Sequence, residues 1–169
     1  MRRVKPVWRW IAVAALGAAG AAAAADYPLL GAQAPDFALR AFEGANVRLS
    51  EHRGDVVVLS FWGSRCGPCR AQLEALERSY ETYRSAGLTV FGISIDDDPE
   101  RAREFARARS VSFPLLLDPG KSVGRMYRID NLPMTLLIDR NGAVRYVHRD
   151  YGPRTDAQYL QQLRTLLNE

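Results

Sequence analysis

Two cysteines, Cys66 and Cys69, are the only ones in the 169-residue chain, and they lie three residues apart across Gly67 and Pro68. A pair with this spacing can supply half of a metal site, close a structural disulfide, or exchange electrons as a reversible dithiol. Arg65 directly precedes the first cysteine and places a full positive charge beside its sulfur. Other residues of the chain must decide between these three kinds of chemistry.

A metal site is disfavoured because the ligands that would complete it are missing. Structural zinc takes four ligands, commonly two cysteine pairs or one pair with two histidines. His52 and His148 are the only histidines, and each is isolated in the sequence. We therefore expect no bound metal, and no cofactor other than a redox-active disulfide between the two cysteines.

A structural disulfide is also disfavoured, because the stabilisation that a disulfide provides grows with the loop it closes. A very small ring is strained and easily reduced, which suits a catalyst. At the start of a helix, the backbone amides and the helix dipole stabilise a thiolate, so the first thiol of such a pair ionises nearer neutral pH. We therefore predict that Cys66 is the nucleophile and Cys69 the resolving thiol.

A buried strand and a helix are expected to hold the pair. A valine-rich apolar run over residues 55–62 indicates a strand that is buried on both faces and ends at Trp62, on the flank of the cysteines. Apolar residues at three- and four-residue spacing then predict an amphipathic helix over 66–86. A second buried strand is predicted over 88–95, and Asp98 with the proline after it predicts the N-cap of a helix.

The rest of the chain predicts a hairpin and a last helix. Short apolar or amphipathic segments follow at 113–118, 122–129, 134–139 and 143–149. Asn141-Gly142 is a strong turn signal between the last two of them, which therefore form a hairpin. Thr155 with Gln158 has the pattern of a capping box and predicts the start of the final helix. This order of elements implies an α/β fold with a central mixed sheet and helices on both faces.

The first 25 residues have the composition of a secretory signal peptide. Four basic residues are followed by 15 apolar and small residues that end in Ala-x-Ala before Asp26. An uncleaved membrane anchor is the alternative, although the apolar stretch is shorter than the roughly 20 residues that a spanning helix needs. We expect cleavage after Ala25, one domain over residues 26–169, and a periplasmic protein, which would be attached to the inner membrane if the segment is kept.

The net positive charge of the chain comes from its first 25 residues. The chain has 23 basic and 19 acidic residues, and the first 25 residues hold four of the basic ones and no acid. The remainder has 19 of each and carries no basic stripe with interleaved aromatic residues. We therefore expect no nucleic-acid partner.

The cysteine segment and its flanks resemble a known family. "RCGPC" after "VVVLSFW" resembles the thioredoxin superfamily, and "GAQAPDFAL", "GLTVFGISIDDD" and "NLPMTLLIDRNGAV" look like the TlpA/ResA-like thiol–disulfide oxidoreductases of the redoxin and AhpC/TSA group. The resemblance runs from about Gly31 to the C-terminus. It implies a thioredoxin-like fold with a four- to five-stranded sheet and an extra N-terminal β-hairpin from about Phe37 to Leu49. It also implies a cis peptide bond before Pro133, next to the disulfide.

An acidic residue near the cysteines is a further implication of the resemblance, and we assign it to Asp97. A carboxylate beneath the disulfide would be partly desolvated, which raises its pKa and suits a general acid/base for Cys69. Asp96, Asp97 and Asp98 compete for this role, and all three are equally compatible with solvated acids at a helix start.

The function implied by the resemblance is exchange of disulfides with protein cysteines by an exported oxidoreductase. Such family members work as reductants that a membrane thiol reductant keeps reduced, and the implied substrates are haem-attachment cysteines of apocytochromes c or copper-site cysteines. We expect this protein to be a monomer. Several residues depart from the family pattern. Arg65 stands where tryptophan is usual, Gln72 and Glu74 replace a common Glu and Pro, and Met134 replaces a common threonine. We expect Arg65 to lower the Cys66 pKa by less than about one unit and to favour a partner with a nearby carboxylate.

Two other functions stay open. "APDF" is shared with peroxiredoxins, whose peroxide-reducing cysteine follows a Pro-x-x-x-Thr/Ser-x-x-Cys stretch. In this chain Gly63 stands three residues before Cys66, and the run through Phe61 contains no proline. The second alternative is a non-catalytic binding module on the same fold, because a fold alone does not assign a function.

Overall fold

The computed structural model describes residues 27–169 of the chain. Its strands are β1 (Ala38–Ala41), β2 (Asn46–Arg48), β3 (Val56–Trp62), β4 (Leu88–Ser94), β5 (Leu115–Leu117), β6 (Met134–Ile138) and β7 (Val144–His148). Its α-helices are α1 (Cys69–Tyr83), α2 (Pro99–Arg107), α3 (Ser122–Met126) and α4 (Pro153–Leu167), and two 3₁₀ helices cover Leu49–His52 and Arg84–Ala86. The signal peptide predicted for residues 1–25 lies outside the described residues.

All seven strands join one mixed sheet in the order β2-β1-β5-β4-β3-β6-β7. β3 lies between β4, with which it is parallel, and β6, with which it is antiparallel. Every residue of β3 is buried, and strands covered on both faces appear in sequence as continuous apolar runs. The buried strand and the mixed sheet predicted from the sequence are therefore confirmed.

The first hairpin extends a five-stranded core sheet. β1 and β2 are antiparallel neighbours, and β1 joins the core by pairing antiparallel with β5. The core strands β5-β4-β3-β6-β7 form the sheet that the family resemblance implies, and β1–β2 form the extra N-terminal hairpin expected between Phe37 and Leu49.

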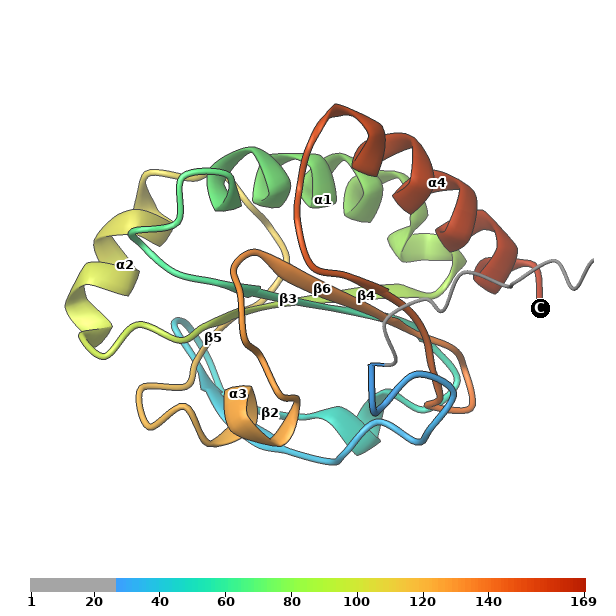
Figure 1. Ribbon diagram of the computed structural model, residues 1–169, viewed down its shortest axis with the longest axis horizontal. Coiled ribbons are helices and arrows are strands. Elements are labelled where there is room, and N and C mark those ends of the chain that lie inside the picture. Colours follow the sequence, from blue (N-terminus) through green and yellow to red (C-terminus); the bar gives the residue numbers. More distant parts are fainter. Residues whose placement is uncertain (1–26) are drawn as a thin grey trace, which may run out of the picture.

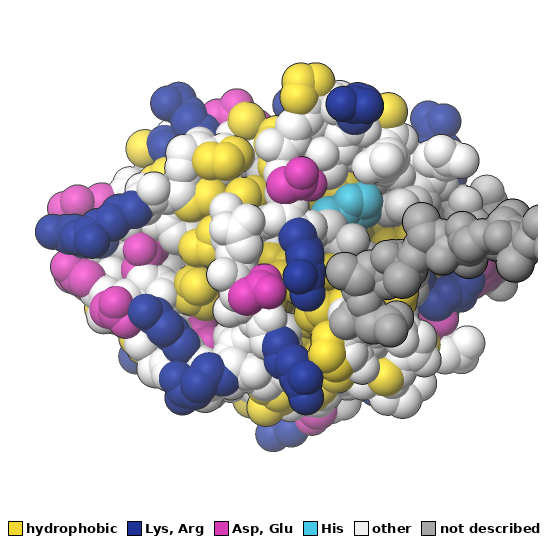
Figure 2. Space-filling model, in the orientation of Figure 1, with side chains coloured by type: hydrophobic (Ala, Val, Ile, Leu, Met, Phe, Trp, Pro, Cys, Tyr) yellow, Lys and Arg dark blue, Asp and Glu magenta, His cyan; other side chains and the backbone are white. Residues whose placement is uncertain are grey.

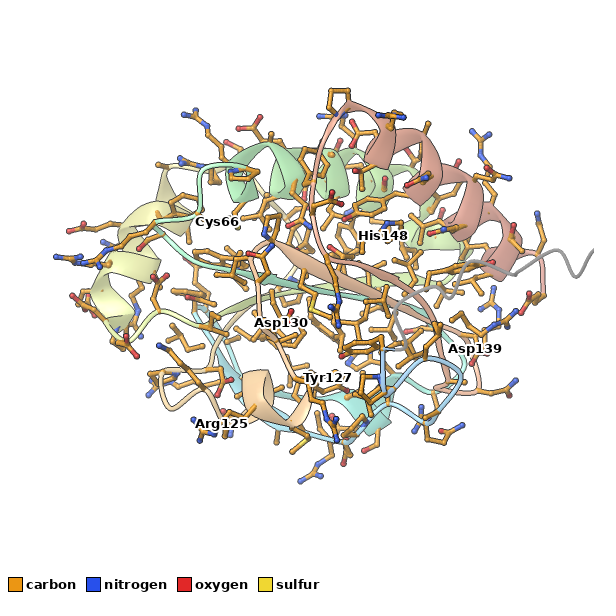
Figure 3. The ribbon with its side chains drawn as sticks, viewed as in Figure 1. Cys66, Arg125, Tyr127, Asp130, Asp139 and His148 are labelled. Carbon is orange, nitrogen blue, oxygen red and sulfur yellow. A yellow bond between two sulfur atoms is a disulfide. The ribbon has the colours of Figure 1, made fainter. Side chains whose placement is uncertain are left out.

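Helices cover the two faces of the sheet unequally (Figure 1). Alternate side chains of a strand point to opposite faces, so Val56 and Val58 of β3 pack with α1, α2 and α4, whereas Val57 and Leu59 pack on the side of α3 and the first hairpin. Figure 3 shows Tyr127, which directly follows α3, on this second side. Its hydroxyl donates to the carbonyl of Pro35 at 2.6 Å and so ties the segment before β1 to the domain.

Two helix starts differ from the prediction. α1 begins at Cys69 instead of Cys66, because the Cys66 N–H bonds to the Gly63 carbonyl in a turn, at 3.0 Å, and Pro68 occupies the N-cap position. α4 begins at Pro153, which is pre-shaped for the first helical position. Thr155 is therefore the third helical residue, and its hydroxyl accepts the Gly152 N–H at 3.0 Å.

The predicted capping pair of Thr155 and Gln158 was wrong for this reason. Gln158 is an exposed residue of the helix body. Within residues 27–169, no helix is both long and apolar enough to cross a membrane.

A buried polar network joins α1 to the sheet and to α4. The Gln72 side chain is fully buried. Its amide oxygen accepts from the Ser60 hydroxyl at 3.0 Å, and its amide nitrogen donates to the hydroxyls of Thr135 and Tyr159. The Tyr159 hydroxyl also donates to Thr135 at 2.9 Å. Because buried polar groups are costly to leave unpaired, this network fixes α1 over the centre of the sheet.

Replacing Gln72 with methionine should therefore destabilise the protein. Methionine has a similar length but leaves the Ser60, Thr135 and Tyr159 hydroxyls without the amide, so we expect the free energy of unfolding to fall by about 1–3 kcal/mol. Urea unfolding measures this change. The exposed Gln158→Met is the matched control and should change stability by less than about 0.5 kcal/mol. Equal effects of the two substitutions would show that the network does not stabilise the fold.

Candidate active site

The two cysteines form a disulfide at the junction between β3 and α1. Their Cα atoms are 5.4 Å apart. β3 ends at Trp62, a turn carries Cys66, and α1 starts at Cys69 (Figure 3). Cys69 is fully buried, whereas Cys66 is partly exposed. The arrangement makes Cys66 the sulfur that another molecule can reach.

The amino end of α1 faces the turn that carries Cys66. The first turn of α1 contains no acidic residue. The positive end of a helix dipole stabilises an anion placed near it, and the anion available here after reduction is the Cys66 thiolate. The expected electrostatic environment of a nucleophilic cysteine is thus present, although the helix starts three residues later than predicted.

The residues predicted to flank the pair occupy two different environments. Trp62 is fully buried, and its ring stacks on those of Phe105 and Phe42, with centroids 5.1 and 6.2 Å away. Gly67, Pro68 and Arg65 are exposed in the turn around Cys66. Trp62 therefore packs in the core at the end of β3, just before the turn, whereas the other three residues are accessible to a partner.

Pro133 stands where the resemblance places it. The Leu132–Pro133 peptide bond is cis, and β6 begins at the next residue. Met134 of β6 pairs with Phe61 of β3, so the bond lies beside the end of the strand that leads to the cysteines. The predicted cis proline is confirmed.

A groove of about 550 Å³ opens beside Cys66. Its walls come from the turn after β3, the ends of β4 and β5, and the loop before Pro133. The lining residues are Gly63, Arg65, Cys66, Ile95, Asp96, Asp97, Asp98, Arg101, Lys121, Asn131 and Leu132. The groove thus carries three acidic and three basic side chains around the nucleophile. Charges of both signs are also interspersed over the face shown in Figure 2.

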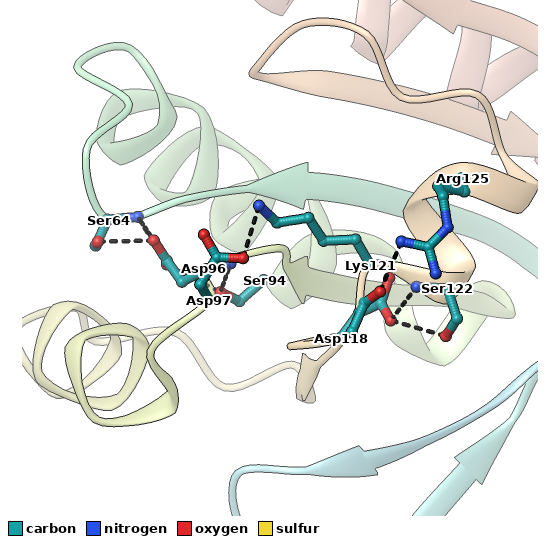
Figure 4. A network of polar contacts seen from close by, with 9 residues as sticks. Ser64, Ser94, Asp96, Asp97, Asp118, Lys121, Ser122 and Arg125 are labelled. Atoms are coloured by element: carbon teal, nitrogen blue, oxygen red, sulfur yellow. Dashed lines mark hydrogen bonds and ion pairs between the residues drawn. The ribbon is translucent and has the colours of Figure 1, made fainter.

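Asp96 holds the turn that carries Cys66 (Figure 4). Its carboxylate accepts the Ser64 N–H at 2.9 and 3.1 Å and the Ser64 hydroxyl at 2.8 Å. It also accepts the Ser94 hydroxyl at 3.0 Å. The carboxylate therefore connects the end of β4 to the residue two positions before Cys66.

The expected desolvation of Asp97 was wrong. The Asp97 side chain is 82% exposed and forms an ion pair with Lys121 at 2.8 Å (Figure 4). Successive residues at a strand end point to opposite sides, so Asp96 turns toward the cysteine turn and Asp97 turns to solvent. Asp97 lines the groove, but burial beneath the disulfide, on which its assignment as the acid/base rested, is absent.

Asp98 has the role expected for it. Its side chain accepts the Glu100 N–H at 3.0 Å and caps α2. Sequence reasoning named all three acids but missed the role of Asp96. The available signal was Ser94, which lies two residues before Asp96 and hence on the same side of the strand.

The chemistry that this arrangement supports is thiol–disulfide exchange. A partly exposed sulfur lies next to a groove, and a second, buried sulfur lies within bonding distance of it. Among residues 27–169, no three or more His, Cys, Asp or Glu side chains are arranged to hold a metal ion.

Known proteins are similar to this chain in sequence and in fold. Residues 30–147 match the model of the AhpC/TSA family. The thiol-disulfide oxidoreductase ResA of Geobacillus kaustophilus is 33% identical over 118 residues, which are 70% of this chain and 68% of that protein.

Two solved structures are also similar. A Chlorobium tepidum protein described as a thiol:disulfide interchange protein DsbE has a TM-score of 0.79 and 33% identity, covering 82% of this chain and 97% of that chain. A Bacteroides thetaiotaomicron protein described as a protein disulfide isomerase has a TM-score of 0.77 and 33% identity, covering 83% and 91%. These matches confirm the thioredoxin-like fold. The chain belongs to the AhpC/TSA family, and within it is a thiol–disulfide oxidoreductase similar to the ResA proteins.

Proposed function

We propose that this oxidoreductase is exported and reduces disulfides of partner proteins outside the cytoplasm. The observation that carries the proposal is the unequal exposure of the two cysteines. Cys66 lines an open groove, and Cys69 is fully buried behind it. A partner sulfur can bond to Cys66 while Cys69 stays out of its reach, and Cys69 can then release the partner.

The reaction transfers two electrons to the partner. The Cys66 thiolate attacks one sulfur of the partner disulfide, that disulfide breaks, and its second sulfur leaves as a thiolate. Cys69 then loses its proton to solvent and attacks the Cys66 sulfur. The Cys66–Cys69 disulfide forms, and the first partner sulfur also leaves as a thiolate. The two partner thiolates take up protons from solvent, so a dithiol and a disulfide have exchanged their oxidation states.

Export and the direction of electron flow rest on the sequence. Residues 1–25 have the composition of a secretory signal, and the chain has no cysteine other than this pair to oxidise. Compartments outside the cytoplasm keep thiols oxidised, so a dedicated reductant there needs its own electron source. We propose a membrane thiol reductant in this role, with the protein acting as a monomer in the periplasm.

The proposed substrates are protein cysteines that must be reduced to free thiols before they bind haem or copper. Haem-attachment cysteines of apocytochromes c and copper-site cysteines have this requirement, because the thiolate is the reactive or ligating form. The groove beside Cys66 is large enough for a short extended segment of such a partner to lie against Asn131 and Leu132, next to the cis Leu132–Pro133 bond.

Trapping tests the assignment of the two cysteines. Cys69→Ser should stall the exchange after the first step, because no resolving thiol remains, and a partner should stay bonded to Cys66. Non-reducing electrophoresis followed by mass spectrometry of a periplasmic extract identifies this mixed disulfide. Cys66→Ser is the matched control and should capture at least tenfold less, since Cys69 is buried. Comparable capture by both variants would refute the assignment.

Two assays on the purified protein separate the alternatives. With dithiothreitol as the electron source, the native protein should accelerate insulin reduction and should not consume hydrogen peroxide. The opposite pattern would favour a thiol peroxidase. A native protein that is active in neither assay, and whose function in the cell persists unchanged in Cys66→Ser, would favour a binding module, because the redox pair would then be dispensable.

Arg65 is proposed to tune the rate and the choice of partner. It is exposed at the edge of the groove next to Cys66, and none of the ion pairs within residues 27–169 involves it. Its guanidinium is therefore available to a partner carboxylate, which it can bind through two parallel hydrogen bonds. It also favours the Cys66 thiolate by Coulomb attraction.

Arg65→Trp should raise the pKa of the Cys66 thiol in the reduced protein by less than about one unit. The reduction potential should move by less than about 10 mV, because only part of the thiolate population changes at neutral pH. Thiolate ultraviolet absorbance against pH and equilibration with glutathione measure the two quantities. A pKa that stays constant, or a potential that moves by several tens of millivolts, would show that Arg65 acts differently.

A further inference from the structure

Of the three acidic residues of the groove, Asp96 is the one that hydrogen-bonds to the turn that carries Cys66. Its carboxylate makes contacts with the Ser64 N–H, the Ser64 hydroxyl and the Ser94 hydroxyl, and its own N–H donates to the Ser94 hydroxyl at 3.2 Å. These contacts cross from β4 to the turn after β3. The Asp96 carboxylate therefore fixes Ser64, two residues before Cys66.

The turn has little freedom to adopt another position. The Cys66 N–H bonds to the Gly63 carbonyl at 3.0 Å. A Cβ atom on Gly63 would come within 3.1 Å of the Leu132 side chain and 3.7 Å of the Asp96 carboxylate. Gly63 thus fits between Asp96 and the loop of the cis proline, and the turn is held from both sides.

The charge of Asp96 is not neutralised by a cation. Its hydrogen-bond donors are two serines, and none of the ion pairs within residues 27–169 includes it. The neighbouring acids differ, because Asp97 pairs with Lys121 at 2.8 Å and Asp98 with Arg101 at 3.6 Å. The charged residues that line the groove together with Cys66 are Arg65, Asp96, Asp97, Asp98, Arg101 and Lys121.

We infer that Asp96 is a positioning residue that fixes the Cys66 turn and, through its unneutralised charge, makes the Cys66–Cys69 pair a stronger reductant. The inference rests on the thiol–disulfide exchange at Cys66 and does not depend on which partner is reduced.

The direction of the effect follows from the charges of the two redox states. The disulfide is neutral, whereas the reduced pair carries a thiolate on Cys66 above its pKa. A nearby carboxylate repels that thiolate and destabilises the reduced form. A pair whose reduced form is less stable gives up its electrons more readily. Arg65 and the α1 dipole act in the opposite direction, so Asp96 limits their effect.

Asp96→Asn removes the charge and keeps an oxygen that can accept the Ser64 N–H. We expect the pKa of the Cys66 thiol to fall by about half a unit to one unit, and its alkylation at pH 7 to become about twofold faster. The equilibrium constant for reduction by glutathione should rise about twofold at pH 7 and approach tenfold, for a full unit, above both pKa values. A change in packing alone would not grow with pH in this way.

Asp97→Asn is the matched comparison, because it removes the same charge one residue away from a side chain that solvent surrounds. We expect its shift of the Cys66 pKa to be less than a third of that in Asp96→Asn. Equal shifts in the two variants, or no shift in a folded Asp96→Asn, would overturn the inference. Asp96→Ser provides a second neutral variant if near-ultraviolet circular dichroism shows that Asp96→Asn is not native. Failure of both to fold would make Asp96 a residue of the fold and would also overturn it.

The wild-type protein separates this inference from the proposed function. Wild-type protein that does not exchange with glutathione would refute the function. The role of Asp96 alone would be refuted if the wild-type protein exchanges with glutathione and the equilibrium constant of Asp96→Asn equals that of the wild type at every pH from 6 to 9.

Discussion

One sulfur must be open to partners while a second sulfur, three residues away, stays buried within bonding distance, and much of the fold serves this constraint. β3 delivers the chain to the site from the centre of the sheet, where β4 and β6 pair with it on either side. α1 carries Cys69 away from the surface and is fixed over the sheet by the buried amide of Gln72. The turn between β3 and α1 is short and is closed by the hydrogen bond from the Cys66 N–H to the Gly63 carbonyl, so Cys66 lies at the edge of the groove.

The charges around Cys66 determine how stable its thiolate is. The α1 dipole and Arg65 favour a thiolate on Cys66, whereas the carboxylate of Asp96, which binds Ser64 and lines the same groove, opposes it. Two further acids of the groove are paired with Lys121 and Arg101 and are therefore largely compensated. The nucleophilicity of Cys66 and the driving force for reduction are both set by this balance, because the thiolate is at once the attacking group and the charged product of reduction.

The sequence predicts those features that depend on local pattern. A continuous apolar run, a Cys-x-x-Cys pair and an Asn-Gly turn each have a local physical cause, and β3, the cysteine pair and the β6–β7 hairpin are found where they were expected. The cis bond before Pro133 was predicted from the family resemblance.

Features that depend on several distant segments were not predictable in the same way. The network of Gln72 joins residues 60, 72, 135 and 159, which meet only after the sheet has formed. The start of α1 depends on a turn closed by the Gly63 carbonyl. The choice between Asp96 and Asp97 depends on which side of β4 faces the cysteine turn. The three adjacent acids do not disclose that side by themselves, and Ser94 was the one local signal for Asp96.

The reduction potential of the Cys66–Cys69 pair tests most directly whether the site is a reductant. Equilibration with defined mixtures of reduced and oxidised dithiothreitol or glutathione, followed by alkylation and mass spectrometry, gives the fraction of dithiol. We predict a potential clearly more negative than the roughly −180 mV of protein disulfide isomerase and nearer to the roughly −270 mV of thioredoxin. A value near the roughly −120 mV of a strong disulfide donor would contradict the proposed function, because the pair would then oxidise the thiols that it is proposed to release.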